Sequence, residues 1–440
     1  MSALDSSVAN IILPVLDKVF STNVAMVEWV VTVYLLVVSG VLLSVGRLGD
    51  LRSHKQMYVL GFFIFVLGSA SCGLSPSIPV LIGSRVFQAL GASMLFANSP
   101  AILTANFPAS QRGQALGMQA TMTYLGLTVG PSLGGWLTDQ FSWRAVFFIN
   151  VPVGVIAIVL SLLFIPAEQE KKEAEPFDIS GALIFLAGLS ALLFALNQGG
   201  AWGWGSAGVI GLLVLAVILL AIFVRMELNK KSPMLDLSLF KSKLFAFSTA
   251  SALLNYVCLY AVVFLLPFYL IQGRGFSTGH AGLILTAEPV LMAISAPISG
   301  TLSDRVGSRS LATIGFGIMT LGLVLLSRLS PVSSIGYLVA SLAIFGLGTG
   351  IFISPNTSAL MGSAPKNRQG IASGILATAR NSGMVVGIGI AGAVFTTVQA
   401  ARLAAGASQS AALFSAIAFS FTLSIAISIA GVLVAAERGT

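Results

Sequence analysis

Long apolar segments follow one another along almost the whole chain, separated by short polar, glycine-rich or proline-containing breaks. A helix rises 1.5 Å per residue, so about 20 apolar residues cross the roughly 30 Å of hydrocarbon in a bilayer. Dividing the chain at its breaks predicts fourteen membrane-spanning helices, at 3–20, 26–46, 57–74, 78–104, 115–138, 145–165, 179–197, 206–225, 244–270, 281–301, 310–329, 334–361, 371–399 and 412–435. Because this number is even, both termini are expected on the same side of the membrane.

Composition identifies lipid as the solvent for these segments. Of the 440 residues, 56% are hydrophobic and only 9% are charged, with a mean hydropathy of +0.96. An ordinary soluble domain has about 25% charged residues. The surplus of apolar surface is too large for one water-soluble core, so the sequence predicts an all-α integral membrane protein.

Basic residues predict the orientation of the helices. If the amino terminus is inside, the cytoplasmic segments contain 16 of the 23 Lys and Arg residues and the outer segments contain five. Cytoplasmic loops retain such residues, so both termini are expected in the cytoplasm of a bacterial-type inner membrane. The same distribution accounts for the net charge of +8. No nucleic-acid partner is expected, because that would need a concentrated basic stripe.

Two pairs of segments repeat along the chain. "GRLGDLRSHK" (46–55) matches "GTLSDRVGSR" (300–309), with Asp50 and Asp304 254 residues apart. "LGLTVGPSLGG" (125–135) matches "SGMVVGIGIAG" (382–392) at an offset of 257. Such matches indicate a duplicated bundle whose halves rock about a central cavity. We therefore predict a six-helix bundle at 1–166, a linker with two inserted helices at 167–243, and a second six-helix bundle at 244–440.

The residues for a metal centre or a catalytic site are scarce. The chain has two Cys and two His residues, and both Cys72 and Cys258 lie within apolar segments. We interpret them as buried small side chains and not as a disulfide or a metal pair. Neither a cofactor nor an enzymatic activity is expected.

Five segments carry a resemblance to a known family. They are "LDSSVANIILP", the Gly/Asp loop at 46–55, "RVFQALGAS", "GLTVGPSLGG" and "WRAVFFINVPVG", in this order along the first half. The chain resembles the 14-spanner drug:proton antiporters of the major facilitator superfamily over nearly its whole length. The resemblance implies the major facilitator fold, alternating access, protons as the coupling ion, and lipophilic small molecules and membrane lipids as partners of a monomer.

The segment "GLTVGPSLGG" also has a physical interpretation. Gly126 and Gly130 form a G-x-x-x-G face that allows a neighbouring helix to approach closely, and Pro131 removes a backbone donor and bends the helix. Gly134 and Gly135 complete the motif. In the resembled family it marks exporters that exchange with protons. A tight helix crossing alone is the structural alternative, and it is compatible with that role.

Arg85 lies about 10 Å inside its predicted helix, where a charge costs at least about 2.5–3.5 kcal/mol unless it finds partners or water. It is therefore expected to face the bundle interior. The resemblance implies a role in proton coupling, and the alternative is a structural Arg that binds carbonyls and Gln88. Arg380 has the same burial problem.

Glu288 lies in "GLILTAEPVLM" (282–292), in an apolar run with no other charge before Asp304. Loss of water favours its neutral form, and Pro289 loosens the backbone hydrogen bonding beside it. Such a carboxyl can exchange a proton for a cation. The alternative is a permanent pair with Arg85 or Arg380. This role rests on burial, because the resembled family usually has an apolar residue here.

Asp5 matches the acidic residue in the first helix of the resembled family, within "LDSSVAN". Only about 14 residues, or about 21 Å of helix, separate the start of that helix from Asp17. The first helix is therefore either unusually short or begins upstream of Met1. If the helix begins upstream, Asp5 is expected in the membrane as a proton-coupling residue. If the helix is short, Asp5 is expected to be solvated.

Two further groups of residues complete the predicted sites. A cytoplasmic gate is expected from Asp50, Arg52, Asp304, Arg305 and Arg309, with each Asp at the start of a following helix, where a carboxylate interacts favourably with the helix dipole. The alternative is a solvated charge cluster. The first copy departs from the family pattern at Leu51 and Ser53. Substrate-binding candidates, chosen as polar or aromatic side chains for an apolar cavity, are Asn10, Tyr34, Gln119, Tyr124, Asn255, Tyr256, Tyr260, Asn356 and Arg380.

Together these features predict a proton-coupled multidrug exporter of lipophilic compounds, with cations favoured. An exporter of an endogenous metabolite or lipid would share every motif. A membrane scaffold or sensor that is derived from such a carrier and does not transport is the alternative from another class, and the short first helix favours it.

Overall fold

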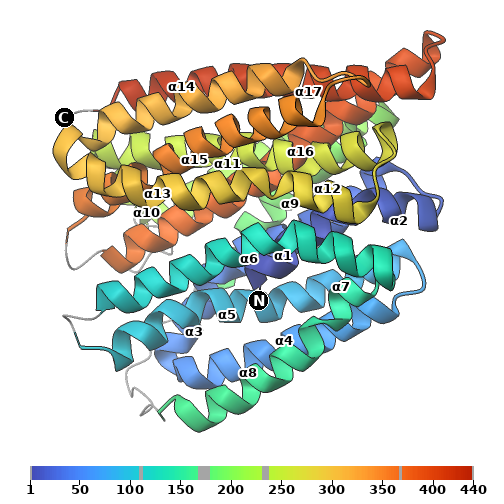
Figure 1. Cartoon of the computed structure of the whole chain (residues 1–440). Coiled ribbons are helices and arrows are strands. Elements are labelled where there is room, and N and C mark those ends of the chain that lie inside the picture. The colour runs from blue at the N-terminus through green and yellow to red at the C-terminus, as the bar shows by residue number, and fades with distance from the viewer. Residues whose placement is uncertain (1, 109–111, 167–178, 230–236, 366–368, 439–440) are drawn as a thin grey trace. The chain divides into compact units, whose positions relative to one another are not determined.

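The computed structural model describes residues 2–108, 112–166, 179–229, 237–365 and 369–438 (Figure 1), and every regular element within these ranges is helical. The chain divides into two compact units. Unit 1 consists of Met1–Ala191 and Leu215–Met234, and unit 2 of Leu192–Val214 and Leu235–Thr440. The all-helical fold class is thus as predicted.

The described residues of unit 1 contain eight complete helices. They are α1 (Ser2–Ile11), α2 (Leu13–Val19), α3 (Val24–Leu51), α4 (His54–Leu74), α5 (Ile78–Asn106), α6 (Arg112–Gln140), α7 (Ala145–Phe148) and α8 (Asn150–Phe164). Two more helices, α9 (Ile179–Trp202) and α10 (Ala207–Asn229), are divided between the units.

Unit 2 begins its own helices with the short η1 (Leu237–Lys241). The helices α11 (Lys243–Pro267), the π-helical η2 (Phe268–Gly273), α12 (Thr278–Leu285), α13 (Ala287–Val306), α14 (Ser308–Ser327), α15 (Ile335–Ser363), α16 (Gln369–Ala404) and α17 (Gln409–Ala436) follow. Gly307, with φ of 89°, makes the turn between α13 and α14, a backbone conformation that favours glycine.

Twelve segments of the described residues are helical, long enough and apolar enough to cross a membrane. Two of the fourteen predicted spans are not among them. The predicted helix at 3–20 is divided into α1 and α2 at Ile12, because Pro14 has no N–H to continue the ladder. The predicted helix at 115–138 corresponds to α6, which has 29 residues and thus about 43 Å of length but is more polar.

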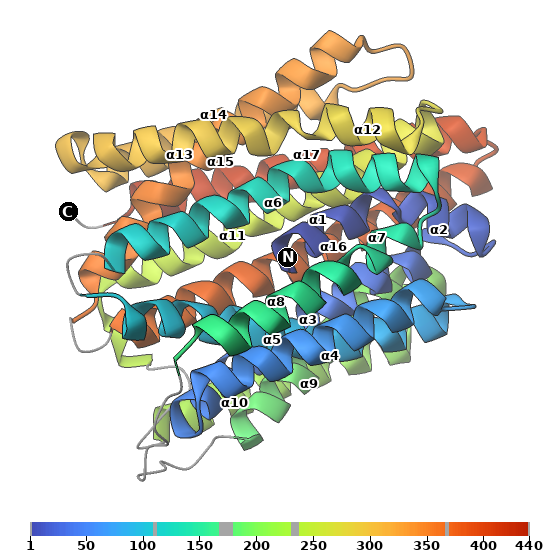
Figure 2. The ribbon, with the colours of Figure 1, turned by 60° about the horizontal axis from the view of Figure 1, so that its bottom comes forward.

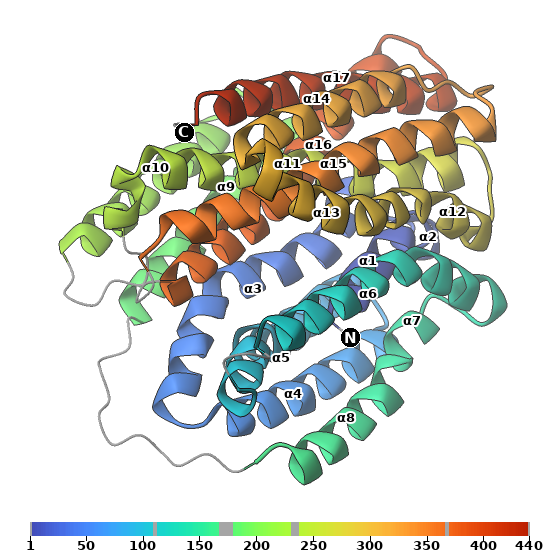
Figure 3. The same cartoon turned by 60° about the vertical axis from the view of Figure 1, so that its left-hand side comes forward.

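The two units repeat one packing pattern. In unit 1, α5 packs against α3 and α4, α6 against α1, and α8 against α4. In unit 2, α15 packs against α13 and α14, α16 against α11, and α17 against α14. Figure 1 shows α14 beside α17, Figure 2 shows α4 beside α8, and Figure 3 shows α13 beside α15. The two units thus share one packing pattern, whereas the predicted bounds of the two bundles and of the linker stay a prediction.

Glycine contacts fix the register of this repeat. A Cβ on Gly61 would meet the carbonyl of Gly91, and a Cβ on Gly315 would meet the carbonyl of Gly348. These residues are related by offsets of 254 and 257, close to those of the sequence matches. Small residues at both crossings let the helix backbones approach closely, as membrane helices do.

Candidate functional site

The centre of unit 1 contains a buried ion pair. Arg85 Nη1 lies 2.6 Å from Asp5 Oδ2, and neither side chain is exposed. Arg85 is seven residues into α5, about 10 Å from its start, and α1 holds Asp5 against it. The structure thus places Asp5 inside the protein, as the membrane interpretation of this residue required.

Arg85 has further partners that hold its side chain in place. Its Nη1 also donates to Gln88 Oε1 at 2.7 Å, and its Nε donates to the Val30 carbonyl at 3.0 Å. The guanidinium carbon lies 4.1 Å from the centre of the Tyr34 ring. Taking two charges out of water is costly, and these hydrogen bonds and the cation–π contact offset that cost. The structural interpretation of Arg85, which binds a carbonyl and Gln88, is thus observed, whereas its role in proton coupling stays a prediction.

Asn150 and Ser69 join this cluster, although the sequence analysis assigned them no role. Asn150 Nδ2 donates to Asp5 Oδ1 at 2.8 Å and to Ser69 Oγ at 3.1 Å. Ser69 Oγ in turn donates to the Phe147 carbonyl at 2.8 Å. The signal in the sequence was Asn150 itself, a polar amide inside the apolar stretch "FFINVPVG".

The cluster surrounds Asp5 with donors. Its Oδ2 accepts from Arg85, and its Oδ1 accepts from Gln88 Nε2 at 3.0 Å and from Asn150 Nδ2. An ionised carboxylate only accepts hydrogen bonds, so three donors fit the charged form. The three donors use three of about four lone-pair sites of the carboxylate, and none of these groups offers an acceptor toward Asp5.

Glu288 in unit 2 has a different environment. It is 5% exposed and lies in the first turn of α13, directly after the break at Thr286 that separates α12 from α13. Pro289 has no N–H for the Leu285 carbonyl, which explains this break. Among the described residues no ion pair joins Glu288 to a basic side chain. Arg85, one of its two expected partners, pairs with Asp5 instead.

The glycines of the antiporter motif pack against α1. A Cβ on Gly126 would meet Leu4, one on Gly130 would overlap Ser7 Oγ, and one on Gly134 would press on Val8. Pro131 lies inside α6, and Gly135 is buried. The motif thus holds α6 close to the helix that carries Asp5.

The predicted gate residues lie at the ends of helices, but the two acids are not where they were expected. Asp50 and Asp304 belong to the last turns of α3 and α13 and do not begin the following helices. The helix α13 continues past Asp304 because the residue that turns the chain, Gly307 with φ of 89°, comes only three residues later. The side chains of both acids lie outside the described part of the chain, whereas Arg52, Arg305 and Arg309 are exposed. The latch itself stays a prediction.

The substrate-binding candidates of unit 1 are already engaged with protein groups. Tyr34 stacks on Arg85, Gln119 Nε2 donates to Ser99 Oγ at 2.7 Å, and Asn10 is 2% exposed. The side chain of Tyr124 lies outside the described residues. Tyr34 therefore belongs to the ion-pair cluster.

The candidates of unit 2 are mostly buried. Asn255 donates to Met319 Sδ at 3.3 Å, and Tyr260 is 6% exposed. The Arg380 guanidinium lies 5.8 Å from the Tyr256 ring centre. Asn356 donates to the Ser248 carbonyl at 3.1 Å and accepts from Arg438 Nη2, so it holds the end of the chain against α15. Substrate contact by any of these side chains stays a prediction.

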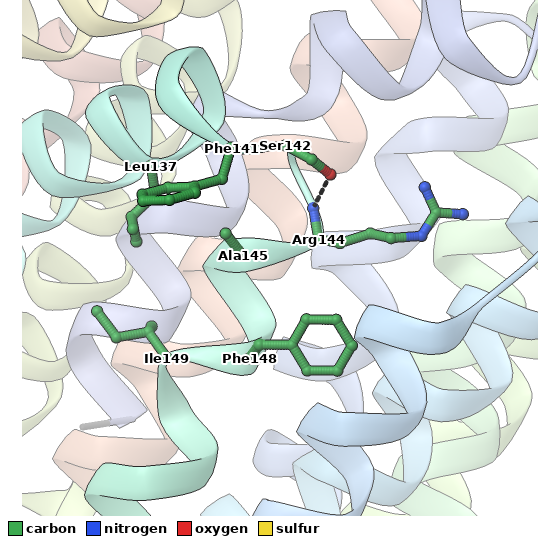
Figure 4. Close-up of a pocket in the computed structure, with 7 residues that line it drawn as sticks. All are labelled: Leu137, Phe141, Ser142, Arg144, Ala145, Phe148 and Ile149. Carbon is green, nitrogen blue, oxygen red and sulfur yellow. Dashed lines mark hydrogen bonds between the residues drawn. The ribbon is translucent and has the colours of Figure 1, made fainter.

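Two surface hollows lie in the described part of unit 1, and neither is lined by Asp5 or Arg85. One, of about 500 Å³, is lined by Leu137, Phe141, Ser142, Arg144, Ala145, Phe148 and Ile149 (Figure 4). The Arg144 guanidinium extends away from Leu137 and Phe141 and donates to the Ser75 carbonyl. The other, of about 520 Å³, lies between α4 and α8. Neither contains the ionisable residues expected for coupling.

Known proteins with similar sequences are transporters. A riboflavin transporter (RibZ) of Clostridioides difficile is 38% identical over 387 residues, which is 88% of this chain and 84% of that protein. The multidrug resistance protein Stp of Mycobacterium tuberculosis is 33% identical over 92% of this chain and 75% of its own length. The tetracenomycin C resistance and export protein of Streptomyces glaucescens is 29% identical over 92% and 74%.

The family assignment combines these similarities with the fold. The chain has the apolar helices of a multi-span membrane protein, and its two units repeat one packing pattern. The sequence model of one family matches residues 1–388, most of the chain. The chain therefore belongs to the Major Facilitator Superfamily, a family of membrane transporters.

Proposed function

We propose that this transporter is a proton-coupled antiporter that exports lipophilic compounds, with cations favoured, by alternating access. The observation that carries the proposal is the unexposed Asp5–Arg85 pair, a carboxylate and a guanidinium that share one site away from water. Buried ionisable groups of this kind mark proton relays in membrane transporters. Glu288, buried without a basic partner among the described residues, supplies a second carboxylate that can favour a cation.

The energy for export comes from the proton gradient. Moving one charge through 100 mV is worth about 2.3 kcal/mol, which corresponds to roughly a 40-fold concentration ratio. We propose that protons are the only coupling species, that no cofactor is bound and that no chemical conversion occurs. The chain acts as a monomer in the cytoplasmic membrane, with both termini in the cytoplasm and lipids as its surroundings.

A substrate-dependent proton flux tests this proposal. The purified chain is reconstituted in vesicles that enclose a pH-sensitive dye, and a lipophilic fluorescent cation is added. Antiport predicts that the cation moves proton equivalents in the opposite direction, and that an uncoupler abolishes cation accumulation. Accumulation that ignores the uncoupler would contradict proton coupling. No transport of any tested compound would favour the scaffold or sensor alternative.

A metabolite transporter is the second candidate function. The relative described as a riboflavin transporter is 38% identical over 88% of this chain, and this similarity favours a metabolite as the substrate. The same vesicles, loaded with riboflavin in place of the cation, separate the two functions. Riboflavin flux with no cation flux would replace multidrug export by metabolite transport. The similarity to Stp and to the tetracenomycin C export protein supports the drug interpretation.

A further inference from the structure

Two hydrogen bonds fix the position of the Asn150 amide in the Asp5 cluster. It is the first residue of α8 and is 2% exposed, and Ser69 of α4 is not exposed at all. The amide Nδ2 has two hydrogens, and it has two acceptors, Asp5 Oδ1 at 2.8 Å and Ser69 Oγ at 3.1 Å. The amide thus links α8 to α1 and α4.

Ser69 fixes which end of the Asn150 amide faces Asp5. The single hydroxyl hydrogen of Ser69 is donated to the Phe147 carbonyl at 2.8 Å. Toward Asn150, the Ser69 oxygen can therefore only accept. An amide oxygen turned toward Ser69 would meet another acceptor, so the Nδ2 end must face both Ser69 and Asp5. The chain from Phe147 through Ser69 to Asn150 holds a donor against the Asp5 carboxylate.

The second amide in the cluster is oriented in the same way. Gln88 Oε1 accepts from Arg85 Nη1 at 2.7 Å and from Cys72 Sγ at 3.6 Å. Its Nε2 is left to donate to Asp5 Oδ1. All three described partners of the Asp5 carboxylate are thus donors, and a proton added to either oxygen has no acceptor among them.

No other ionisable group in the described contacts replaces these partners. The titratable side chains around the Asp5–Arg85 pair are Tyr34 from α3 and Cys72 from α4. In the contacts that the structure describes, α2, α6, α7 and α8 place no charged side chain against Asp5. The hydrogen-bonding surroundings of the Asp5 carboxylate are therefore set by the orientation of the two amides and by Arg85.

We propose that Asn150 is a positioning residue for Asp5, which holds an N–H against the ionised carboxylate, and that this contact weakens when Asp5 takes up a proton. Oδ1 accepts two hydrogen bonds and Oδ2 accepts one, so the proton adds to the lone pair that Oδ2 has free. Oδ1 then becomes the oxygen of a neutral carbonyl, and a hydrogen bond to it is weaker than one to a carboxylate. The tie between α8 and α1 is then a contact that the proton weakens. This inference rests on the proton coupling proposed above.

Infrared difference spectroscopy of the full chain in vesicles tests the proposal without transport. The carbonyl band of a protonated carboxyl that disappears in Asp5→Asn identifies Asp5, and its intensity is followed against pH. Asn150→Leu removes one of three donors to the carboxylate, so the pH midpoint of the band is expected to rise by about one unit. Ser69→Ala keeps the amide but frees its orientation, and a rise of about half a unit is expected.

Ser93→Ala is the matched control. Ser93 is as buried as Ser69 and also donates to a carbonyl at 2.8 Å, but that carbonyl is Ala89 of its own helix. Ser93→Ala should therefore leave the pH midpoint of the Asp5 carbonyl band unchanged. A wild-type midpoint in Ser69→Ala and in Asn150→Leu would overturn the proposal, and if the Leu variant does not fold, Ser69→Ala decides alone. Titration of Asp5 in a protein without proton flux would instead reject the proposed function and leave this inference standing.

Discussion

Unit 1 and unit 2 have the same helix packing but bury different groups at equivalent positions. A Cβ on Gly68 would meet the backbone of Gln88, and a Cβ on Gly322 would meet the backbone of Phe345, so these two contacts correspond. Gln88 and Phe345 are 257 residues apart, and the same offset relates Arg85 to Leu342. Unit 1 therefore buries the Arg85 guanidinium and the Gln88 amide at the positions where unit 2 buries the apolar side chains of Leu342 and Phe345.

The carboxylates of the two units differ in the same way. Asp5 has three donors within hydrogen-bonding distance, whereas Glu288 has no basic partner among the described residues. Glu288 lies 254 residues after Tyr34, whose ring covers the Arg85 guanidinium in unit 1. The two units thus share close glycine crossings but differ in the polar residues that they bury.

The largest expected effect is at Arg85. Arg85→Met leaves the Asp5 charge buried without a counter-ion, which costs about 3–5 kcal/mol of unfolding free energy. Leu342→Met, at the equivalent position of unit 2, exchanges side chains of similar volume and should cost less than about 1.5 kcal/mol. Denaturant titration of both variants in the same detergent measures the difference. Equal losses would mean that the pair contributes no more than packing does.

Replacing a glycine at equivalent helix crossings should destabilise unit 2 more than unit 1. A Cβ on Gly387 would overlap the backbone of Val257, whereas one on Gly130 would meet the movable side chain of Ser7. We expect Gly387→Ala to lower the unfolding free energy by about 1–3 kcal/mol and Gly130→Ala by less. The same titration ranks the two variants.

For function, Gly130→Leu should abolish drug efflux. Unchanged efflux in a folded Gly130→Leu protein would mean that the motif has no role in transport.

Glu288→Gln tests the carboxylate of unit 2. The amide imitates the protonated acid and cannot attract a cation, so cation transport should fall about tenfold, equivalent to about 1.4 kcal/mol, and should no longer vary with external pH. Transport of a neutral compound is the control and should change little. Cation transport with its pH dependence intact would exclude Glu288 from coupling.

The smallest effect is expected at Arg438, beyond the end of α17. Burial lowers the pKa of this guanidinium to about 10. The unfolded chain, with the higher pKa, therefore holds the proton more tightly, so the penalty to stability is complete below about pH 10 and disappears only as the pH rises further. Arg438→Met removes this penalty together with the bond to Asn356. We expect the unfolding free energy of Arg438→Met to differ from that of the wild type by no more than about 1 kcal/mol at neutral pH. Thermal unfolding measures the difference, and a loss of several kcal/mol would contradict the expectation.

Most helices of the fold were predictable from local patterns. The segments expected at 26–46, 78–104 and 412–435 correspond to α3, α5 and α17, because a long apolar run in lipid must satisfy its backbone within itself. The break between α1 and α2 was also present in the sequence, as Pro14, but hydropathy does not detect it. The ends of α3 and α13 were misplaced because charge patterns do not locate the last turn of a helix.

The candidate site was predictable only in part. Burial identified Arg85 and Glu288 as residues that need partners, since a charge in an apolar segment is costly wherever it lies. Asp5 was identified by the resemblance to a known family. Their partners could not be derived, because Asp5 and Arg85 are 80 residues apart and Asn150 is 145 residues from Asp5. The only pairs that the sequence suggested, as the alternative interpretation of Glu288, joined Glu288 to Arg85 or Arg380 and included neither Asp5 nor Asn150.

By itself, the sequence determined the solvent, most of the helices, the duplication and the burial of Arg85 and Glu288. These properties depend on the composition and spacing of residues along one segment, which act over a few turns. Only the tertiary structure decided that Asp5 meets Arg85, Gln88 and Asn150, and that Glu288 meets no cation among the described residues. Those contacts depend on how distant helices pack, and a hydrogen bond or an ion pair forms only where packing brings two groups within about 3 Å.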